Sequence, residues 1–396
     1  MDVMPGTAGR LGPVADWIAR EGRLEAGLQR FLAALMDRIV GAGIPVWRVY
    51  LGMQLMHPQL QAMGLVWQRD QEVRVMEIPR RHGIELSPAY VGSPVQEIRE
   101  CGSAVRYRLH DLNDGHHLVL HEVKAAGGTD YFGLAIRVGD GRPNPIITFA
   151  TDRPSGFSDA DLADLALLPD LIGAVIEMHI NRLIASTVIE TYLGRETGQR
   201  ILHGLIRRGD GDRINAVLWF SDLRDFTGLN ERLPADELLD MVNMYFEAIG
   251  IALKNHGGEI LKFIGDGVMA IFPVLDAMFL PEATAGAIDA ARDALSAIEE
   301  VNAGRVEAGR EPIRFGVGLH VGPVTFGNVG TAERLDFTVI GPAVNRCARL
   351  EGLTKVLRAP VLASADFHRV CPRPMRSLGR HRLRGVPEPV EIFTVA

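Results

Sequence analysis

The chain has 396 residues, a length typical of two domains. Hydrophobic residues make up 47% and charged residues 23% of it, so the composition excludes a largely disordered chain. A net charge of -7 argues against a nucleic-acid partner, because nucleic-acid-binding surfaces are usually basic. No apolar run reaches the length of about 18 residues that a membrane span needs, and the N-terminus lacks the basic and apolar segments of a signal peptide. The three cysteines lie far apart and predict no disulfide framework, so we expect a cytoplasmic protein.

The N-terminal part predicts an α+β domain over residues 24–157, preceded by a tail over residues 1–23. Apolar residues at helical spacing predict a helix over residues 24–40, which closely spaced glycines end. Short alternating or apolar runs predict strands, and one further helix precedes a glycine pair. The predicted strands cover residues 46–51, 65–68, 73–78, 105–109, 131–138 and 146–150, the second helix covers residues 117–126, and residues 79–95 are expected to form a loop.

Residues 158–211 are predicted to form a signalling helix and a linker between two domains. Ser158 is a favourable N-cap, and apolar residues follow it at helical spacing as far as Leu183. Pro169 lies inside this segment, so we expect a kink or two separate helices. The apolar stripe is either part of a core or the contact with a second chain, and the stretch over residues 194–213 is expected to be the linker itself.

The segment over residues 212–396 predicts a second domain with the element order β-α-β-β-α-β, which is the ferredoxin-like arrangement. Its glycines favour tight turns between paired strands. The predicted strands cover residues 214–220, a hairpin over 259–264 and 268–272, a second hairpin over 313–320 and 324–329, and a closing pair over 381–384 and 390–395, while the helices cover residues 235–256, 282–308 and 342–353.

Two aspartates stand at strand ends of this second domain. Asp222 follows a buried strand, and Asp266 occupies the turn of the first hairpin. Strand pairing in a ferredoxin-like sheet would bring the two carboxylates together, where they repel each other. A divalent cation such as Mg²⁺ resolves this repulsion, because it prefers a few carboxylate oxygens together with substrate phosphates. The alternative is that an aspartate in a Gly-Asp-Gly sequence only makes the turn.

A second polar group lies further along the chain. Asn345 and Arg349 are four residues apart on a predicted helix and therefore share a face. A guanidinium stabilises a phosphoryl transition state, and an amide can orient a ribose. The alternative is a solvated helix face. Lys262 lies inside an apolar strand, where a lysine is rarely buried without a partner.

Three segments in this order resemble the signature blocks of the class III nucleotide cyclases, and the resemblance covers residues 212–396. The first is Phe-Ser-Asp-Leu-Arg-Asp-Phe-Thr at residues 220–227, and the second is Leu-Lys-Phe-Ile-Gly-Asp-Gly at residues 261–267. The third is Thr-Val-Ile-Gly-Pro-Ala-Val-Asn-Arg-Cys-Ala-Arg at residues 338–349. Three ordered blocks at matching spacing are far more specific than one short motif.

The resemblance implies a head-to-tail homodimer with two shared active sites. In each site, Asp222 and Asp266 of one chain would bind two Mg²⁺ or Mn²⁺ ions. Phe226 and Thr227 of the first block are assigned to substrate binding, and Arg384 matches a basic position that holds the terminal phosphates. The implied reaction is attack of the ribose 3′-hydroxyl of ATP on the α-phosphate, with pyrophosphate leaving.

The resemblance also implies that the other chain supplies four residues to each site. Asn345 would orient the ribose and Arg349 would stabilise the transition state, while Lys262 and Thr338 would read the base. Adenine presents an acceptor at N1 and a donor at its amino group, which a lysine and a threonine hydroxyl complement. The guanylate cyclases of the family use Glu and Cys at these places, so this pair favours ATP and an adenylate cyclase, a phosphorus–oxygen lyase.

Two alternatives stay open at this point. One is a guanylate cyclase, and the other is a catalytically inactive module that only binds nucleotide or dimerises; intact Asp222, Asp266, Asn345 and Arg349 argue against the second. One departure from the family pattern is Asp225 where Gly is common, in a loop that would face the phosphates.

The end of the N-terminal domain resembles a GAF domain, by its element order and by the Phe-Ser-Asp-Ala-Asp-Leu segment at residues 157–162. The resemblance implies a sensor for an unknown small molecule or signal. The histidines at positions 116, 117 and 121 suggest a metal site or, more simply, an exposed cluster, because no cysteine completes a site. Trp47, Trp67 and Tyr131 either line a pocket or belong to the core.

Overall fold

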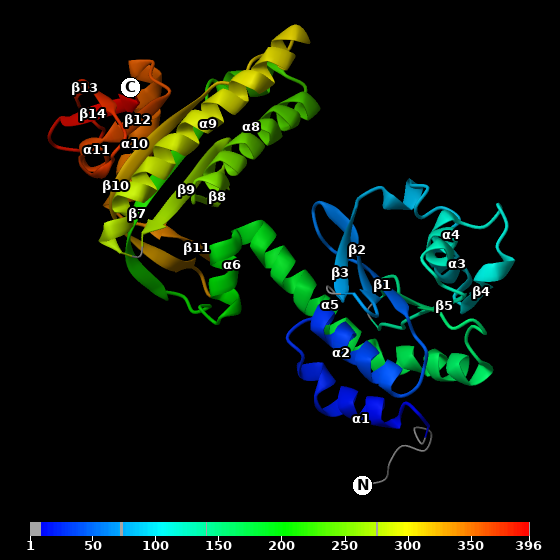
Figure 1. Cartoon of the computed structure of the whole chain (residues 1–396). Coiled ribbons are helices and arrows are strands. Elements are labelled where there is room, and N and C mark those ends of the chain that lie inside the picture. Colours follow the sequence, from blue (N-terminus) through cyan, green and yellow to red (C-terminus); the bar gives the residue numbers. More distant parts are fainter. Residues whose placement is uncertain (1–8, 72–73, 140, 275, 396) are drawn as a thin grey trace. The chain divides into compact units, whose positions relative to one another are not determined.

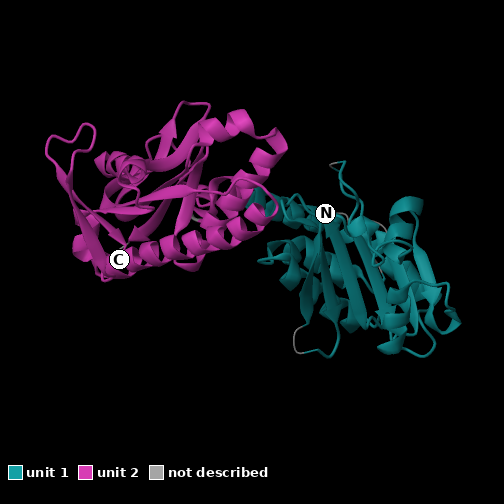
Figure 2. Cartoon of the chain, turned by 90° about the horizontal axis from the view of Figure 1, so that it is seen from above, with its two compact units in different colours: residues 1–188 teal, residues 189–396 magenta. Residues whose placement is uncertain are grey.

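The computed structural model describes residues 9–71, 74–139, 141–274 and 276–395. The chain divides into two compact units, residues 1–188 and residues 189–396 (Figure 2). No helix among the described residues combines the length and the apolar character needed to cross a membrane.

Unit 1 is built on a six-stranded sheet in which all neighbouring strands are antiparallel. In spatial order its strands are β3 (Val75–Arg81), β2 (Leu60–Gln68), β1 (Arg48–Gln54), β6 (Ile146–Thr151), β5 (Asp130–Ala135) and β4 (Val105–Arg108). The structure thus contains every predicted strand of this domain, although Val73, at the start of one prediction, lies outside the described residues. Alternation along the strands gives the sheet two faces with different coverings.

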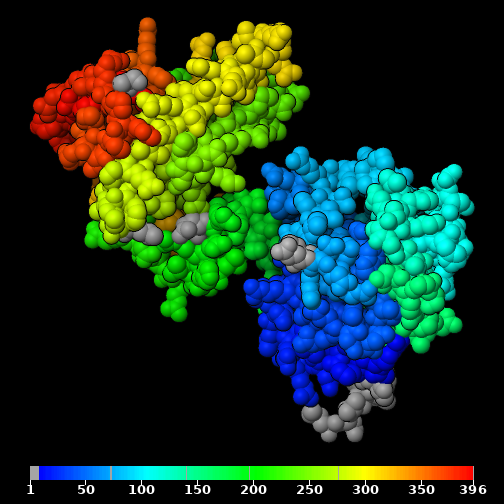
Figure 3. Space-filling model, viewed as in Figure 1, coloured from blue at the N-terminus to red at the C-terminus, as the bar shows by residue number. Residues whose placement is uncertain are grey.

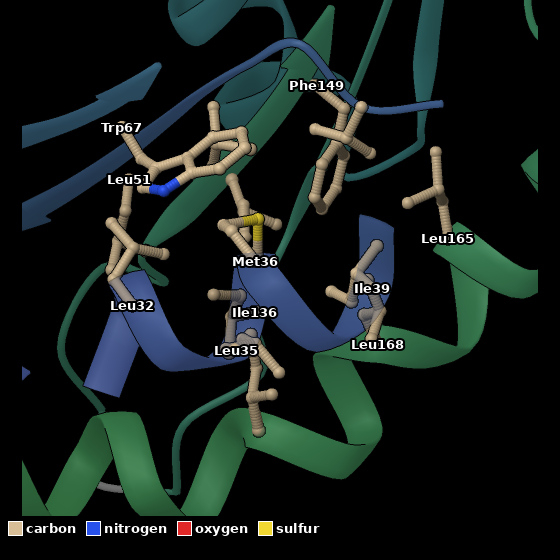
Figure 4. Packing of buried hydrophobic residues seen from close by; sticks show 14 of the residues in the cluster. Leu32, Leu35, Met36, Ile39, Leu51, Trp67, Ile136, Phe149, Leu165 and Leu168 are labelled. Carbon is tan, nitrogen blue, oxygen red and sulfur yellow. The ribbon is translucent and has the colours of Figure 1, made fainter. Parts of the chain in front are cut away.

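One face of this sheet packs on helices α2 (Leu28–Gly41) and α5 (Asp159–Leu193). Apolar side chains from the strands and from both helices interdigitate there (Figure 4). The residues labelled in that view are Leu32, Leu35, Met36 and Ile39 of α2, Leu51, Trp67 and Phe149 of the strands, Ile136, and Leu165 and Leu168 of α5. Trp67 is therefore a core residue.

The predicted N-terminal tail is wrong for residues 12–20, which form helix α1 (Gly12–Arg20); residues 1–8 lie outside the described residues. Trp17 is buried and stacks on Phe31 of α2 with 5.8 Å between the ring centroids. Pro13 lies in the first turn of this helix, where the missing amide costs nothing. In the space-filling view α1, in dark blue, lies along the surface of this unit (Figure 3).

The opposite face of the sheet is covered by a short 3₁₀ turn, η2 (Ile84–Leu86), and by helices α3 (Pro94–Cys101) and α4 (Leu118–Ala125). The loop predicted over residues 79–95 is therefore wrong at both ends, since β3 runs to Arg81 and α3 begins at Pro94. Ser93 caps α3, because its hydroxyl accepts the Gln96 amide at 3.2 Å. Short 3₁₀ turns, η1 (Gly22–Leu24) and η3 (Leu109–Asp111), complete the unit.

Helix α5 begins in unit 1 and ends in unit 2 as one helix of 35 residues. Ser158 caps it as predicted, since its hydroxyl accepts the Asp161 amide at 3.2 Å. Of the two alternatives expected at Pro169, a kink or two separate helices, the second is wrong, because one helix continues through this residue. Pro169 is buried against the core, and tertiary packing holds the helix there. The linker predicted over residues 194–213 contains a second helix, α6 (Arg195–Leu202), and its end belongs to the next strand.

Unit 2 contains an eight-stranded sheet. Its path is β13 (Met375–His381), β14 (Val390–Val395), β12 (Val361–Ser364), β10 (Phe315–Gly330), β7 (Gly211–Leu223), β9 (Gly267–Val274) and β8 (Glu259–Ile264), and β11 (Leu335–Ile340) pairs with β10. Along the chain β7, α8, β8, β9, α9 and β10 follow the predicted β-α-β-β-α-β order.

The two faces of this sheet carry different helices. Helices α8 (Ala235–Asn255) and α9 (Leu280–Glu307) lie side by side and cover one face (Figures 1 and 3). Helix α10 (Pro342–Leu357) covers the other. The remaining short elements are α7 (Phe226–Arg232), η4 (Ala277–Phe279) and α11 (Ala365–Val370).

The hairpin predicted over residues 313–329 is wrong, because these residues form the single 16-residue strand β10. Gly322 and Pro323 suggested a turn. Pro323 instead falls between the segment paired with β12 and the segment paired with β11, where one side of the strand has no partner and a missing amide is tolerated. The strand predicted over residues 381–384 lies earlier, since β13 ends at His381.

Candidate active site

The two aspartates singled out in the sequence come together at one end of the sheet of unit 2. Asp222 lies next to the last residue of β7, and Asp266 lies in the tight turn between β8 and β9. Strands β7 and β9 pair directly, with Ser221 opposite Val268. The two carboxyl groups are within hydrogen-bonding contact, and burial together with the Asp266 charge raises the pKa of Asp222 to about 6. The turn is tight because Gly265 has a φ of 63°, which a glycine adopts without strain.

Helix α10 brings further charges to this pair. Lys355 places its ammonium 3.9 Å from the Asp222 carboxylate. Glu351 is only 8% exposed, and its Oε1 atom has no hydrogen-bond partner. Burial, reinforced by the charge of Asp222, raises the pKa of Glu351 to about 7. Sequence reasoning missed both residues, although they lie one helical turn apart on the helix that carries Arg349.

Three carboxyl groups thus lie together beside the cations Lys355 and Arg224, and the repulsion among the carboxylates favours a bound cation. Two adjacent carboxylates suit Mg²⁺ or Mn²⁺. No group of three His, Cys, Asp or Glu side chains among the described residues is arranged to hold a metal ion. The residues present fit a divalent cation whose remaining ligands come from water or from a phosphate-bearing substrate.

Three glycines of β10 fix the position of α10. Gly316, Gly318 and Gly322 are separated by even numbers of residues, so they lie on the same face of the strand, the face that α10 covers. A β-carbon on Gly318 would lie 2.5 Å from the Glu351 amide nitrogen, so only glycine allows this close approach. Cys347 also holds the helix against this strand, since its thiol donates to the Gly318 carbonyl oxygen at 3.1 Å.

The opposite side of α10 presents Asn345, which is exposed, and Arg349, which is half-buried. Arg349 lies beside the segment after β13, where its guanidinium would be 3.4 Å from a β-carbon on Gly385. Arg384 precedes this glycine and is exposed. Within the described ranges no hydrogen bond or ion pair engages the side chains of Asn345, Arg349 or Arg384. Two guanidiniums and an amide are therefore available to a ligand on this side.

Lys262 lies on β8, and its ammonium forms an ion pair with Asp336 of β11. Phe337 and Val339 of β11 are buried, so by alternation Asp336 and Thr338 share the other face of the strand. The carboxylate of Asp336 thus holds Lys262 at strand β11, two residues before Thr338.

The first signature block ends in helix α7. Asp225 precedes this helix with a φ of 59°, the left-handed region in which glycine is easiest to place. Its carboxylate pairs with Arg232 at 3.1 Å, and Arg232 also pairs with Glu311, so a single arginine is shared by two carboxylates. Phe226 packs against the core under α8 and α9, whereas Thr227 is exposed.

The candidate residues of the N-terminal domain are the histidine cluster and the aromatic residues Trp47 and Tyr131. The histidine cluster is held by local contacts, with His116 bound to Asn113 and His117 capping α4. Trp47 belongs to a buried cluster, while Tyr131 both belongs to that cluster and lines a cavity described below.

Comparison with known proteins agrees with the signature blocks. Residues 212–371 match the family model for the adenylate and guanylate cyclase catalytic domain. The chain is 33% identical over 190 residues to adenylate cyclase 1 of Rhizobium meliloti (strain 1021), covering 46% of this chain and 28% of that protein. It is 33% identical over 199 residues to an adenylate cyclase of Anabaena cylindrica, covering 48% of this chain and 38% of that protein.

Solved structures of cyclases are also similar to this chain. The adenylyl cyclase CyaB from P. aeruginosa has a TM-score of 0.41 and 27% identity, covering 47% of this chain and 96% of that one. The guanylyl cyclase Cya2 has a TM-score of 0.42 and 29% identity, covering 47% of this chain and 93% of that one.

Residues 212–371 of unit 2 therefore form a class III nucleotide cyclase catalytic domain. The chain spans less than two fifths of the length of the curated relatives named above.

Proposed function

We propose that the protein is an adenylate cyclase that converts ATP to 3′,5′-cyclic AMP and pyrophosphate. The observation that carries the proposal is the pair of neighbouring carboxyl groups of Asp222 and Asp266 inside a cyclase catalytic domain. A protein that kept the fold only for dimerisation would have no need for two mutually repelling carboxylates at one strand end.

Asp222 and Asp266 would hold the Mg²⁺ or Mn²⁺ ions, two per site. Bound there, the ions would neutralise phosphate charge and lower the pKa of the attacking hydroxyl. The chain's own contribution is to fix the two carboxylates at the ends of neighbouring strands, with the buried carboxyl group of Glu351 beside them.

The base-reading assignment rests on Lys262 and Thr338. A lysine can donate to N1 of adenine, and the threonine hydroxyl can accept from its amino group. The ion pair with Asp336 orients the lysine side chain toward β11. The second candidate is a guanylate cyclase, and such an enzyme is among the similar solved structures.

The remaining groups are assigned to a second copy of the chain. Asn345 would hold the ribose, Arg349 the transition-state charge and Arg384 the terminal phosphates. Their lack of partners among the described residues supports a role toward a ligand. Phe263 and Ile264 at the tip of β8 are 52% and 51% exposed, an apolar surface that a homodimer would cover.

In the proposed reaction the 3′-oxygen forms a bond to the α-phosphorus while the bond from that phosphorus to the pyrophosphate oxygen breaks. The proton of the 3′-hydroxyl passes to water, and pyrophosphate leaves. Arg349 would donate to the oxygens on which charge accumulates, which stabilises the transition state more than the bound substrate.

The test is formation of cyclic AMP by the purified protein with ATP and Mn²⁺, with GTP assayed in parallel. Asp222→Ala and Asp266→Ala should each abolish turnover, whereas Asp240→Ala, at an exposed position of α8, should not. Cyclic GMP as the main product would establish the second candidate. No product from either nucleotide, or near-normal turnover by both site variants, would refute the proposal.

The shared site has a direct test of its own. Asp266→Ala and Arg349→Ala proteins, each inactive alone, are mixed under conditions that allow subunits to exchange. If the residues come from different chains, each mixed dimer has one intact site and should regain up to about half of the wild-type rate. No recovery, with exchange shown by differently tagged subunits, would place both residues in one chain.

We also propose that unit 1 is a GAF-like sensor domain that regulates the cyclase. A sheet with helices on both faces and a helix that leads directly into unit 2 support this role.

A further inference from the structure

Unit 1 contains a cavity of about 230 Å³ on the sheet face opposite the α2 and α5 core. Its floor is formed by side chains of five strands, and its roof by η2, α3 and α4. Apolar side chains make up much of the lining, among them Val66, Ile78, Val95 and Val123. An apolar cavity with a few converging polar groups is the usual form of a small-molecule site.

Three arginines line this cavity, which is unusual for an apolar site. Arg48 comes from β1, Arg80 from β3 and Arg99 from α3. No carboxylate among the described residues forms an ion pair with any of the three. Glu122 is an acidic residue of the lining, and its side chain is exposed.

Arg99 has an unpaired hydrogen-bond donor. Its Nε atom is buried and lacks a partner, and its Nη1 atom lies a long 3.5 Å from the Tyr90 hydroxyl. A buried donor without an acceptor costs about 1–3 kcal/mol, and more when the group is charged. Such a group is therefore typical of a site whose acceptor is a ligand.

Tyr50 shows that two of these guanidiniums face the same part of the cavity. The Tyr50 ring lies over two glycines that pair across strands β1 and β2, Gly52 and Gly64. A β-carbon on Gly52 would be 2.9 Å from the Tyr50 hydroxyl. Burial raises the pKa of Tyr50, while Arg80 and Arg99 act in the opposite direction. Arg80 from the floor and Arg99 from the roof therefore both act on this hydroxyl, and all three side chains line the same cavity.

We propose that this cavity binds a small organic anion. Its carboxylate or phosphate group lies between Arg80 and Arg99, and its apolar body lies against Val66, Ile78 and Val123. The guanidinium fork matches both anionic groups with paired hydrogen bonds. Arg48 adds positive charge to the same cavity, and the ring of Tyr50 offers an apolar surface beside the anionic group.

The experiment measures binding of three fluorinated probes to the full chain by ¹⁹F NMR line broadening. Two probes are anions, 4-fluorobenzoate and 4-fluorophenyl phosphate, and the third is the neutral 4-fluorobenzamide. The variants are Arg80→Gln and Arg99→Gln. The matched control is Arg81→Gln, because Arg81 is the next residue of β3, is exposed and does not line the cavity. Thermal unfolding of each variant shows whether it is folded.

We expect at least one anionic probe to bind the wild type and the Arg81→Gln control with equal affinity. Binding should weaken at least tenfold in Arg80→Gln and Arg99→Gln, and the neutral amide should not bind. Comparison of the two anions tells whether a carboxylate or a phosphate is preferred. Absence of binding by both anions, equal binding of the amide, or retained affinity in both folded variants would overturn the proposal. If both folded variants kept their affinity for 4-fluorophenyl phosphate, this probe would be bound elsewhere, for example at the nucleotide site of unit 2. The readout is binding, so the outcome does not depend on the cyclase activity proposed above.

Discussion

Replacing Asp222 with asparagine should stabilise the metal-free protein at neutral pH while abolishing its catalysis. Burial and the neighbouring Asp266 raise the pKa of Asp222 from 3.8 to about 6. A shift of about two pKa units corresponds to roughly 3 kcal/mol of cost to the folded state. The Asp222 side chain is 34% exposed, so solvent screening reduces this, and we expect a gain of about 1–2 kcal/mol. For a unit of this size that is a rise in melting temperature of about 3–6 °C.

The sign of the pH dependence follows from the direction of the shift. A carboxyl group whose pKa is raised in the folded protein holds its proton more tightly there than in the unfolded chain. Stability therefore falls as the pH rises from 3.8 towards 6, and the full cost is present above pH 6. The increase in the free energy of unfolding caused by Asp222→Asn should be complete at pH 7.5 and about a third as large at pH 4.5.

The assay is thermal unfolding of the wild type and Asp222→Asn at both pH values, with a chelator and then with excess Mg²⁺. Mg²⁺ should raise the melting temperature of the wild type and leave that of the variant unchanged. Asp240→Asn, at an exposed position of α8, serves as the control and should change neither value. An Asp222→Asn protein no more stable than the wild type at pH 7.5, or one with the same gain at both pH values, would refute the reasoning.

Three further changes test other parts of the proposals. Lys262→Glu combined with Thr338→Cys should lower the rate with ATP and improve the ratio of GTP to ATP turnover, because the donor and acceptor pattern is reversed; an unchanged preference for ATP would mean that these residues do not read the base. Inserting one residue after Gly194, where the junction of α5 and α6 lies against β8, should change basal cyclase activity more than melting temperature; unaltered kinetics over insertions of one to four residues would argue against coupling through this segment. Gly318→Ala should lower the melting temperature by several degrees and reduce turnover, because its β-carbon would lie 2.6 Å from the Cys347 carbonyl oxygen and push α10 away. Gly304→Ala in α9, which has open space around it, should be neutral or stabilising, and equal effects of the two substitutions would contradict this account.

Much of the fold of unit 2 could be predicted from the sequence, because most of its helices, strands and turns are specified by residues close together in the chain. The element order and the turn at Asp266 follow from hydrophobic period and from glycine placement. The same reasoning failed for β10, where Gly322 and Pro323 read as a turn. Whether a proline ends a strand depends on which neighbour pairs at that point, and pairing is not a local property.

The wrong predictions for unit 1 also come from contacts between segments that are far apart in sequence. Helix α1 contains a proline and follows a segment with several glycines, so its sequence alone favours a tail; it is held by Trp17, which packs on α2. Helix α5 passes through Pro169 because packing on the sheet replaces the stability that the proline removes.

The sequence by itself determined the cyclase catalytic domain of residues 212–371, the residue types of the candidate site and the pairing of Asp222 with Asp266, because motif spacing and strand order are written along the chain. Only the tertiary structure decided that Glu351 and Lys355 join that pair, that Lys262 rests on Asp336, and that three arginines share one cavity. These contacts join segments far apart in sequence. Their geometry depends on strand register and on how closely a helix approaches a sheet, and no local pattern encodes either.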